Sequence, residues 1–314
     1  MKYGIITPAY NEAGFLEDFM HSVIMQSCKP DTFLIVDDGS TDETAAIAKQ
    51  IASEHEWISV ITRPGEARYQ IGSKVVDNFN YGLDNSASSN WDFVVKLDAD
   101  LILPPDYFEK ISRQLQENPD LGICGGVCAV PLQESDHSRT NGGTDNNQNP
   151  YGRFDPSQLK VEKLTDRFHV RGPIKSYRMA CFKDINGLRS LYGWDTLDEL
   201  LAEYHGWRIE IIPELKVIHR RPTGTKTATL HLHIITGEMF YRLGYGPLIS
   251  FLASAKRYRM SPFVISALMS WAGYIRAAIR RDERYVSRDE MRFIRKLRYR
   301  RMKSKLLPFN KANQ

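Results

Sequence analysis

Apolar and polar positions follow two different periods along the first hundred residues. Four short apolar runs have the length and β-branched content of buried strands, and we expect strands at residues 3–7, 32–36, 58–62 and 92–97. Between these runs apolar residues recur every three to four positions, as in amphipathic helices, at residues 15–24, 45–52 and 75–83. Strands that alternate with helices predict an α/β fold with a parallel sheet covered by helices on both faces.

The pattern is less regular after residue 100. A helix is expected over residues 105–118 and a strand over 121–130, and two late strands are expected over 208–213 and 216–219. Residues 133–158 are rich in Asn, Gly, Ser and Asp, which predicts a long flexible loop.

Polar clusters follow three of the first four predicted strands. They read Thr7-Pro8-Ala9-Tyr10-Asn11-Glu12, Asp37-Asp38-Gly39-Ser40-Thr41-Asp42 and Asp98-Ala99-Asp100. In open α/β sheets, ligands bind beyond the carboxyl ends of the strands. A turn would explain any one cluster, because Asp, Gly and Ser favour turns, but it does not explain three clusters at one edge. Ser40 and Glu43 also have the spacing of a capping box, which predicts the start of the second helix.

Asp98 and Asp100 place two carboxylates at the end of a buried strand, where they repel each other. A divalent cation relieves this repulsion, since Mg²⁺ or Mn²⁺ binds through one or two carboxylates and takes phosphate oxygens as further ligands. We therefore expect one carboxylate to reach the ion and the other to face a substrate that carries a diphosphate. A solvated acidic turn is the alternative.

The same clusters resemble the opening motifs of family 2 glycosyltransferases. The motifs are Pro8-Ala9-Tyr10-Asn11-Glu12, Val36-Asp37-Asp38-Gly39-Ser40-Thr41-Asp42 and Lys96-Leu97-Asp98-Ala99-Asp100, and the likeness continues through Phe79-Asn80-Tyr81-Gly82 and Pro104-Pro105-Asp106-Tyr107-Phe108. It covers roughly residues 1–222. It implies the GT-A fold, a Rossmann-like sheet, and an inverting glycosyltransferase of the hexosyltransferase type.

The resemblance also implies roles for single residues. Pro8, Tyr10 and Glu12 would line the base and ribose of a nucleotide-sugar. Asp38 would meet the uracil edge. Asp98 would contact the ribose or the sugar, and Asp100 would hold the metal ion, Mg²⁺ or Mn²⁺.

One position departs from the family pattern. The family often has an arginine before the metal motif, where this chain has Phe79. Lys74 and Arg68 are both candidates for the lost contact with the anion.

Inverting transfer needs a carboxylate that accepts the proton of the attacking hydroxyl. In the family a base motif precedes a Gly-aromatic pair, which here is Gly206-Trp207; counting back places Asp195 on the base. Asp198 is one residue out of register and Glu199 is a fallback. The alternative is that these acids stabilise the N-terminal end of a helix through its dipole.

A second group of candidates lies later in the chain. The resemblance makes His219 a second metal ligand or a diphosphate contact, while a purely structural histidine is the alternative. Arg221 and the flexible residues 223–225 are candidates to close over the diphosphate. Arg178 is a candidate to face the donor or the acceptor, and an ordinary surface arginine is the alternative.

Charge is distributed unevenly. From Arg276 onward the chain has 14 basic and 4 acidic residues, a net charge of +10, whereas the remaining 28 basic and 34 acidic residues give −6. A basic tail indicates an anionic partner surface, either membrane or nucleic acid. The apolar stretches 247–255 and 262–275 are each shorter than the ~20 residues needed to cross a bilayer.

These stretches predict helices that lie at a membrane interface. Arg280, Arg281 and residues 292–305 would meet anionic headgroups. A helical subdomain packed on the body is the alternative. No nucleic-acid motif accompanies the basic residues, so we expect no nucleic-acid partner.

Composition adds little to this picture. With 314 residues, 42% of them hydrophobic, the chain can bury a core without disulfides. Its cysteines (Cys28, Cys124, Cys128 and Cys181) show no C-x-x-C spacing, so we expect reduced, buried thiols, with a zinc or redox role as the alternative. The N-terminal residues lack the apolar core of a signal peptide, and we expect a cytosolic protein at the inner face of the cell membrane.

Together these patterns predict a GT-A catalytic domain over residues 1–222 and a helical, basic, membrane-interfacial region over 223–314. The predicted activity is metal-dependent transfer of a sugar to a lipid-linked or surface-glycan acceptor in polysaccharide biosynthesis. The donor is a nucleoside-diphosphate sugar, and we expect a UDP-sugar. A sugar nucleotidyltransferase shares the sheet and an acidic metal site, but it would need a Gly-rich loop after the first strand, and residues 8–12 are not one. A non-catalytic scaffold of the same fold is the second alternative.

Overall fold

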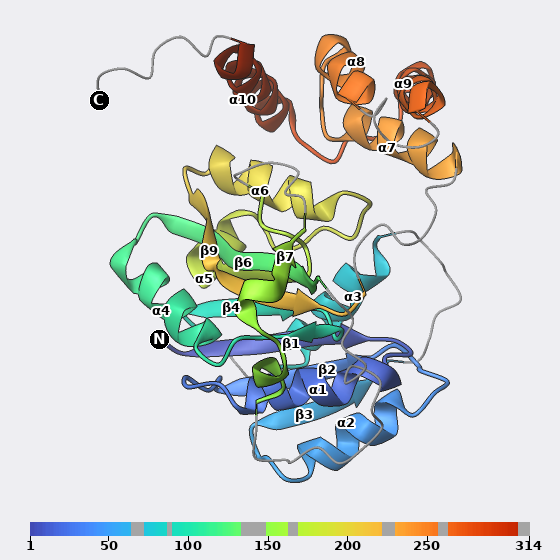
Figure 1. Cartoon of the computed structure of the whole chain (residues 1–314). Coiled ribbons are helices and arrows are strands. Elements are labelled where there is room, and N and C mark those ends of the chain that lie inside the picture. Colours follow the sequence, from blue (N-terminus) through green and yellow to red (C-terminus); the bar gives the residue numbers. More distant parts are fainter. Residues whose placement is uncertain are drawn as a thin grey trace. The chain divides into compact units, whose positions relative to one another are not determined.

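The computed structural model describes residues 1–63, 72–86, 90–132, 149–162, 169–221, 230–256 and 263–306. The chain divides into two compact units, Met1–Pro222 and Thr223–Gln314, which Figure 1 shows in colours that follow the sequence.

The first half of unit 1 alternates strands and helices. In chain order it contains β1 (Tyr3–Ala9), α1 (Ala13–Ile24), β2 (Thr32–Asp37), α2 (Thr44–Ala52), β3 (Ile58–Thr62), α3 (Lys74–Asp84) and β4 (Phe93–Leu97). β1 lies between β2 and β4, β3 lies outside β2, and all four strands are parallel. The four strands and three helices expected in this half are confirmed.

The second half of unit 1 departs from this regular alternation. It contains β5 (Leu101–Ile102), α4 (Tyr107–Glu117), β6 (Leu121–Pro131), β7 (Leu159–Val161), β8 (Ile174–Arg178), α5 (Met179–Asp184), α6 (Trp194–Tyr204) and β9 (Arg208–His219). In the described part of the chain one sheet has the order β3-β2-β1-β4-β8-β6-β9-β5, with β7 beside β6. Because β8 is antiparallel to both β4 and β6, the sheet is mixed, and the prediction of a wholly parallel sheet is wrong for this half.

Two local predictions also differ from the structure here. The two late strands are a single strand, β9, whose register against β6 shifts between Gly125 and Val127. Part of the predicted long loop is ordered, because residues 150–153 and 156–158 form 3-10 turns and lead into β7. Tyr151 and Phe154 of this segment pack against a small core cluster. Residues 133–148 of the predicted loop lie outside the described residues.

Alternate residues of the strands face helices on opposite sides of the sheet, as predicted. Ile5 and Phe33 belong to the main core cluster with Phe19 of α1, which also contains residues of α2 and α4. On the opposite face of the sheet, Ile6 and Val36 face α3, where a Cβ added to Gly82 would lie 2.7 Å from each of them. The glycine therefore lets α3 approach the sheet closely.

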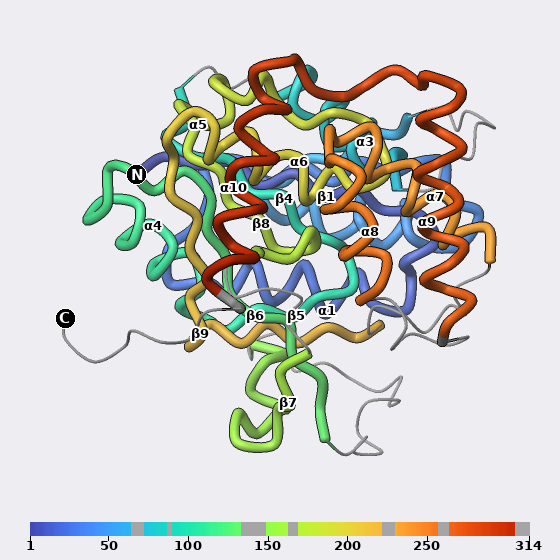
Figure 2. The backbone as a smooth tube through the Cα atoms, turned by 90° about the horizontal axis from the view of Figure 1, so that it is seen from above, coloured from blue at the N-terminus to red at the C-terminus, as the bar shows by residue number. Residues whose placement is uncertain are grey.

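Unit 2 is helical. It contains α7 (Leu230–Arg242), α8 (Pro247–Lys256), α9 (Phe263–Arg280) and α10 (Arg288–Leu306), and Figure 2 shows their paths. α7 and α9 are in backbone contact: a Cβ on Gly237 would lie 1.7 Å from the carbonyl oxygen of Ser270, and one on Gly273 would lie 2.1 Å from that of Ile234. The helices expected near 247–255 and 262–275 are present, whereas α7 was not expected.

Candidate active site

The loops that follow β1 and β2 are tied to each other. The amide of Asp38 donates to the carbonyl of Ala9 at 2.9 Å, and the side-chain oxygen of Asn11 accepts from the amide of Thr41 at 2.8 Å. Asn11 itself adopts a left-handed backbone conformation, with φ of 54°, which asparagine tolerates better than most residues. The two polar clusters therefore form one surface at the carboxyl ends of the strands.

The second helix is not begun by the predicted capping box. Ser40 instead accepts a hydrogen bond from the amide of Asn11 at 3.0 Å. Asp42 accepts from the amide of Thr44 at 3.0 Å and from the amide of Ala13 at 3.2 Å. One carboxylate thus satisfies amides at the starts of both α1 and α2, which fixes the two loops at the sheet edge.

Three predicted nucleotide contacts lie together at this edge. The ring of Tyr10 is half exposed, and the ammonium of Lys74 lies 5.9 Å from its centroid. The same ammonium is 3.3 Å from Asp38 Oδ2. Pro8 is opposite Val36 in the β1–β2 register and leads into Tyr10. Arg68, the other candidate for the anion contact, lies outside the described residues.

The two predicted metal ligands are brought together by a short strand pair. β5 is antiparallel to β9, with Leu101 opposite His219, and the amide of Arg220 donates to the carbonyl of Asp100 at 2.9 Å. His219 Nε2 lies 3.7 Å from Asp100 Oδ2, and both side chains are buried. Residues 119 positions apart in the sequence therefore meet at the end of the sheet.

This pair offers a carboxylate and an imidazole that could hold a divalent cation. Asp100 Oδ1 is buried and has no hydrogen-bond partner within the described residues. Burial and the nearby charge of Asp98 raise the pKa of Asp100, against the opposing effects of His219 and Arg221. A carboxylate oxygen and an imidazole nitrogen are suitable ligands for Mn²⁺, and a carboxylate oxygen suits Mg²⁺. In the described part of the chain, no three His, Cys, Asp or Glu side chains gather as a metal cluster.

Arg221 neutralises the acids at this end of the site. It forms an ion pair with Glu12, and its Nε lies 3.2 Å from Asp100 Oδ2. Asp98 forms an ion pair with Lys96, a buried residue of β4 that also donates to the carbonyl of Gly172 at 3.0 Å. The predicted partners of Arg221 at residues 223–225 lie outside the described residues.

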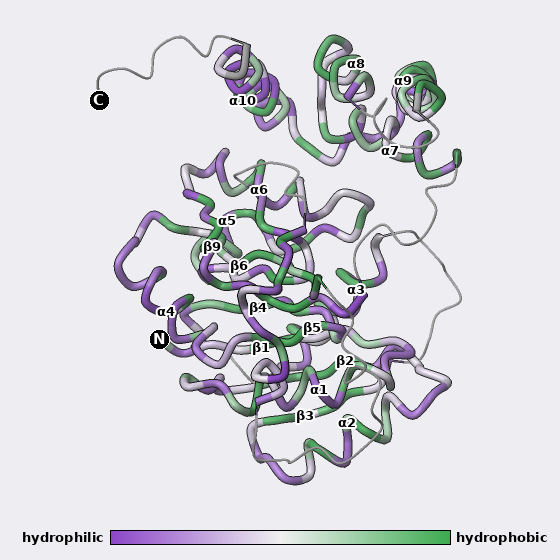
Figure 3. Tube along the Cα trace, in the orientation of Figure 1, coloured by the Kyte–Doolittle hydropathy of each residue, from purple (hydrophilic) through white to green (hydrophobic). Residues whose placement is uncertain are grey.

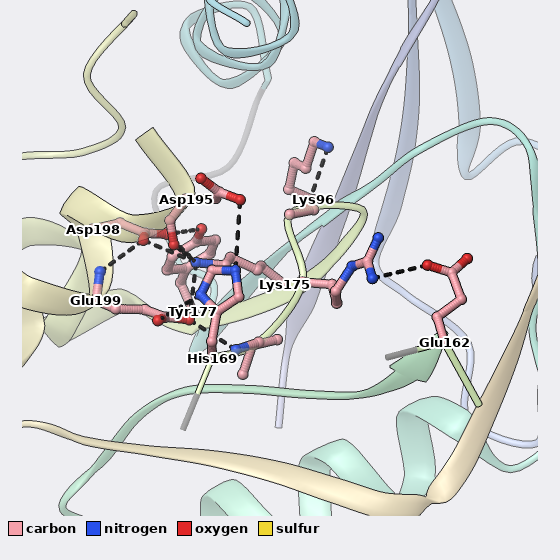
Figure 4. A network of polar contacts seen from close by, with 11 residues as sticks. Lys96, Glu162, His169, Lys175, Tyr177, Asp195, Asp198 and Glu199 are labelled. Carbon is pink, nitrogen blue, oxygen red and sulfur yellow. Dashed lines mark hydrogen bonds and ion pairs between the residues drawn. The ribbon is translucent and has the colours of Figure 1, made fainter. Parts of the chain in front are cut away.

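The three candidate bases all lie within α6 (Trp194–Tyr204), and they occupy different surroundings there (Figure 4). Asp195 is in the first turn, and 35% of its side chain is exposed. Asp198 and Glu199 are buried beside Lys175, whose ammonium lies 2.8 Å and 3.1 Å from their respective carboxylates. Tyr177 donates a further hydrogen bond to Asp198 at 2.5 Å. The exposed carboxylate is the one that a substrate hydroxyl can reach.

His169 contacts two of these acids. Its Nδ1 lies 2.9 Å from Glu199 Oε2, and its Nε2 lies 3.6 Å from Asp195 Oδ2. Burial would lower the pKa of His169, but hydrogen bonds with Asp195 and Glu199 raise it to about 9. Burial would raise the pKa of Asp195, but His169 and Lys175 hold it below the ordinary value. Asp195 is therefore ionised at neutral pH and able to accept a proton.

The prediction that Arg178 faces the donor or the acceptor is wrong. Arg178 pairs with Phe93 at the start of β4, so it lies at the edge of the sheet opposite the candidate site. Its guanidinium donates to the carbonyls of Leu115, Asn118 and Leu121, around the C-terminal end of α4. This arginine caps a helix, a role that its position in the sequence does not reveal.

Sequence reasoning missed several residues that support the site. They are Lys96, Glu162, His169, Arg171 and Lys175, most of them labelled in Figure 4. Lys96 and Lys175 have no more than 1% of their surface exposed, although lysine is almost never fully buried without a partner. A charged residue inside a strand, such as Lys96 in the run Val94-Val95-Lys96-Leu97, was the available signal.

Comparison with known families gives one match that covers more than half of the chain. Residues 4–185 match the family described as glycosyl transferase family 2. The matched range contains the three polar clusters and ends before Asp195 and His219.

Two curated relatives are similar over part of the chain. An uncharacterized glycosyltransferase of Haemophilus influenzae is 25% identical over 130 residues, which are 41% of this chain and 38% of that protein. A poly-β-1,6-N-acetyl-D-glucosamine synthase of Staphylococcus aureus is 26% identical over 117 residues, which are 37% of this chain and 26% of that protein. The chain therefore matches well under half the length of either relative.

A solved structure shows the fold. The crystal structure of GalNAc-T7 with UDP, GalNAc and Mn²⁺ superposes with a TM-score of 0.60 at 11% sequence identity, and the match covers 98% of this chain and 58% of that one. At this identity the likeness concerns the fold alone, which is the GT-A fold.

Proposed function

The chain belongs to glycosyl transferase family 2, and from this premise we propose that it transfers a sugar from a nucleoside-diphosphate sugar to an acceptor hydroxyl with inversion at the anomeric carbon. The nucleotide lies on Tyr10 and Asp38, where the exposed ring offers a stacking surface and the carboxylate can accept the imide proton of uracil. UDP is therefore the proposed nucleotide. Lys74 and Arg221 supply positive charge for the diphosphate.

One observation carries the proposal. The β5–β9 pair joins Asp100 to His219 beside the nucleotide loops, and Asp100 keeps a buried oxygen without a hydrogen-bond partner among the described residues. Burying an oxygen atom without a hydrogen-bond partner costs free energy unless a ligand binds to that atom. Asp100 and His219 would hold Mg²⁺ or Mn²⁺. A bound ion of this kind stabilises the negative charge that develops on the leaving diphosphate.

Asp195 is the proposed proton acceptor. It is ionised at neutral pH and partly exposed at the start of α6, whereas Asp198 and Glu199 are buried and paired with Lys175. As the acceptor hydroxyl attacks the anomeric carbon, its proton passes to Asp195 and the bond between that carbon and the diphosphate oxygen breaks. His169 and Lys175 keep the carboxylate in its ionised form.

We further propose that unit 2 lies on the cytosolic face of a membrane and brings the enzyme to a lipid-linked or surface-glycan acceptor. α9 has small and polar residues inward beside the aromatic Tyr274, and it has apolar residues outward, as helices in lipid do. Its buried residues include Ser266, Ser270 and Ala277, while Leu268 and Ile279 are exposed by 59% and 77%. Figure 3 shows the apolar character of α8 and α9 beside the hydrophilic α10.

The charge of α10 agrees with an anionic lipid surface. The helix, Arg288–Leu306, carries eight arginines and lysines after its first turn, and basic residues near anionic lipid contribute ~1 kcal/mol each. No helix among the described residues combines the length and the hydropathy required of a membrane span. A helix with apolar and basic surfaces can lie in the interface plane. The name of the staphylococcal relative, a polysaccharide synthase, supports a glycan acceptor.

The test of the enzymatic proposal is a donor screen. Purified protein with Mn²⁺ or Mg²⁺ is given UDP-N-acetylglucosamine, UDP-glucose, UDP-galactose and GDP-mannose in turn, and release of free nucleotide is followed. We expect release from one donor, lowered by about two orders of magnitude in Asp100→Asn because the metal loses its carboxylate. Asp84→Asn, an exposed residue at the end of α3, is the matched control.

Two results would count against the proposal. Equal turnover by Asp100→Asn and wild type would show that a metal ion held by Asp100 is not required for catalysis. Binding of UDP without turnover of any donor, in the presence of lipid extract as acceptor, would favour a non-catalytic scaffold.

A further inference from the structure

Residues 169–173 lie between the acids of α6 and the subsite of Asp100 and His219, and the segment has contacts toward both. His169 contacts the acids of α6, and Arg171 forms an ion pair with Glu162 at 2.8 Å. The carbonyl of Gly172 accepts from Lys96, and the carbonyl of Pro173 accepts from the amide of Asp98 at 3.1 Å. The segment then continues into β8.

At one end, contacts of the segment fix the orientation of His169 toward Asp195. Glu199 is held by the amide of Val170 at 2.8 Å and by Lys175 at 3.1 Å. Glu199 in turn faces Nδ1 of His169, so the orientation of the imidazole is set by a buried, anchored carboxylate. The opposite ring nitrogen, Nε2, then points to Asp195.

At the other end the segment fixes the orientation of His219. Glu162 binds Arg171 through Oε2 and lies 2.7 Å from Nδ1 of His219 through Oε1. This contact leaves Nε2 of His219 on the side of Asp100. A carboxylate on the far nitrogen is the common arrangement around histidines that bind metals, and it sets both the tautomer and the ring orientation.

The segment is also packed directly against α6. A Cβ added to Gly172 would lie 3.1 Å from the ring of Trp194 and 3.5 Å from Cβ of Asp195. The amide of Ile174 donates to the carbonyl of Arg171 at 3.1 Å, which closes the backbone into a turn. The segment is therefore held by contacts with α6 and by its own turn.

We propose that residues 169–173 set the position of the proton acceptor relative to the metal subsite, with His169 as the positioning residue for Asp195 and Arg171, through Glu162, as the positioning residue for His219. This inference rests on the proposed function, because it assigns a role to each end of the segment in the same reaction. Neither residue contacts the reacting atoms in this assignment.

His169→Gln tests the first end. The substitution removes the cation beside Asp195, which still faces Lys175 and Lys96, so we expect the acid limb of the kcat profile to move to higher pH by about one unit. kcat should fall by about 10–100-fold, with the affinity for Mn²⁺ and UDP unchanged. His205→Gln, at the exposed C-terminal end of α6, is the matched control.

A second measurement at this end needs no substrate. His169 faces Asp195, Glu199 and Lys175, and NMR titration of its imidazole in Asp195→Asn should give a pKa clearly lower than in wild type. An unchanged pKa would show that the two side chains are not coupled, and would overturn this part of the inference even if His169→Gln does not fold.

Arg171→Met tests the second end. Glu162 loses its arginine partner and orients His219 less well, so we expect the affinity for Mn²⁺ in the presence of UDP to fall by about 10–100-fold. Electron paramagnetic resonance of free Mn²⁺ measures this affinity directly. Arg171→Lys should retain part of it, and Arg113→Met, at an exposed ion pair on α4, should retain all of it.

The outcomes separate this inference from the proposed function. If wild type turns over no donor, the proposed function fails, and the Mn²⁺ and NMR measurements still test the segment. If wild type is active but His169→Gln keeps its kcat and pH profile, or Arg171→Met keeps its affinity for Mn²⁺, the inference is wrong and the segment is structural.

Discussion

Within one turn and a half of α6, three carboxylates have been given different surroundings. Asp195 is partly exposed, while Asp198 and Glu199 are buried with Lys175. A buried ion pair contributes little net stability, but removing one partner leaves an uncompensated charge. Burial therefore distinguishes a carboxylate available for chemistry from carboxylates that hold the structure, although their residue types are nearly identical.

We therefore expect Asp195→Asn to impair catalysis and Asp198→Asn to impair stability. We expect Asp195→Asn to bind UDP and Mn²⁺ normally, by calorimetry, and to lose transfer by about 10²–10⁴-fold, because the proton acceptor is gone. We expect Asp198→Asn to lower the free energy of unfolding by about 3 kcal/mol in urea, because Lys175 loses its closest carboxylate.

Normal transfer by Asp195→Asn would show that another residue of α6 acts as the base. Unchanged stability of Asp198→Asn would show that Glu199 alone compensates the buried charge of Lys175.

At the scale of elements, close contacts between helices and strands depend on a few small residues. Gly82 on the inner face of α3 leaves no room for a Cβ, since Ile6 and Val36 would each lie 2.7 Å from it. Gly14, near the start of α1, would meet nothing within 4 Å. The same substitution at these two helical glycines therefore separates packing from helix propensity.

We expect Gly82→Ala to lower the free energy of unfolding by about 1–2 kcal/mol, because overpacking displaces α3 from the sheet. Gly14→Ala should raise it by about 0.5–1 kcal/mol, because alanine favours the helix and restricts the unfolded chain. Urea denaturation of both variants measures the difference. Equal effects of the two substitutions would mean that α3 can shift at no cost.

One strand that sequence reasoning missed, β8, is polar although it is buried. β8 has Lys175, Ser176 and Tyr177 fully buried, yet its residues do not form the apolar run expected of a central strand. Lys175 and Tyr177 are tolerated there because Asp198 binds both. Their burial depends on a partner more than twenty residues further along the chain, and local patterns carry no trace of it.

At the scale of the whole molecule, the chain combines an acidic body with a basic tail. Unit 1 carries the candidate catalytic site, and unit 2 presents exposed apolar residues on α8 and α9 and basic residues on α10. The combination of apolar and cationic surfaces supports the proposed binding to an anionic bilayer through insertion and charge together.

We expect the full chain to bind vesicles that contain phosphatidylglycerol and to bind more weakly at high salt, because basic residues contribute through screened interactions. Leu268→Glu and Ile275→Glu should each lower the partition coefficient by about tenfold, since each removes an apolar side chain from the interface. Leu132→Glu, at an exposed leucine of unit 1, is the control. Sedimentation with vesicles provides the measurement, and equal partition of all variants would contradict the membrane proposal.

The sequence by itself determined the regular part of this protein. Strand and helix periods, the three polar clusters and the basic tail are local patterns, because each depends on residues within a turn or a strand of one another. These local patterns were sufficient to predict the α/β class and the family. They also predicted that Tyr10, Asp38 and Asp100 lie at the same edge of the sheet.

Only the tertiary structure decided which of these residues can work together. The antiparallel insertion of β8, the contact between Asp100 and His219, the opposite location of Arg178 and the links from His169 and Arg171 all join distant segments. Burial and charge pairing depend on those long-range contacts, and they give Asp195, Asp198 and Glu199 their different surroundings. A carboxylate has no role in isolation, because its neighbours in space fix its ionisation and its accessibility.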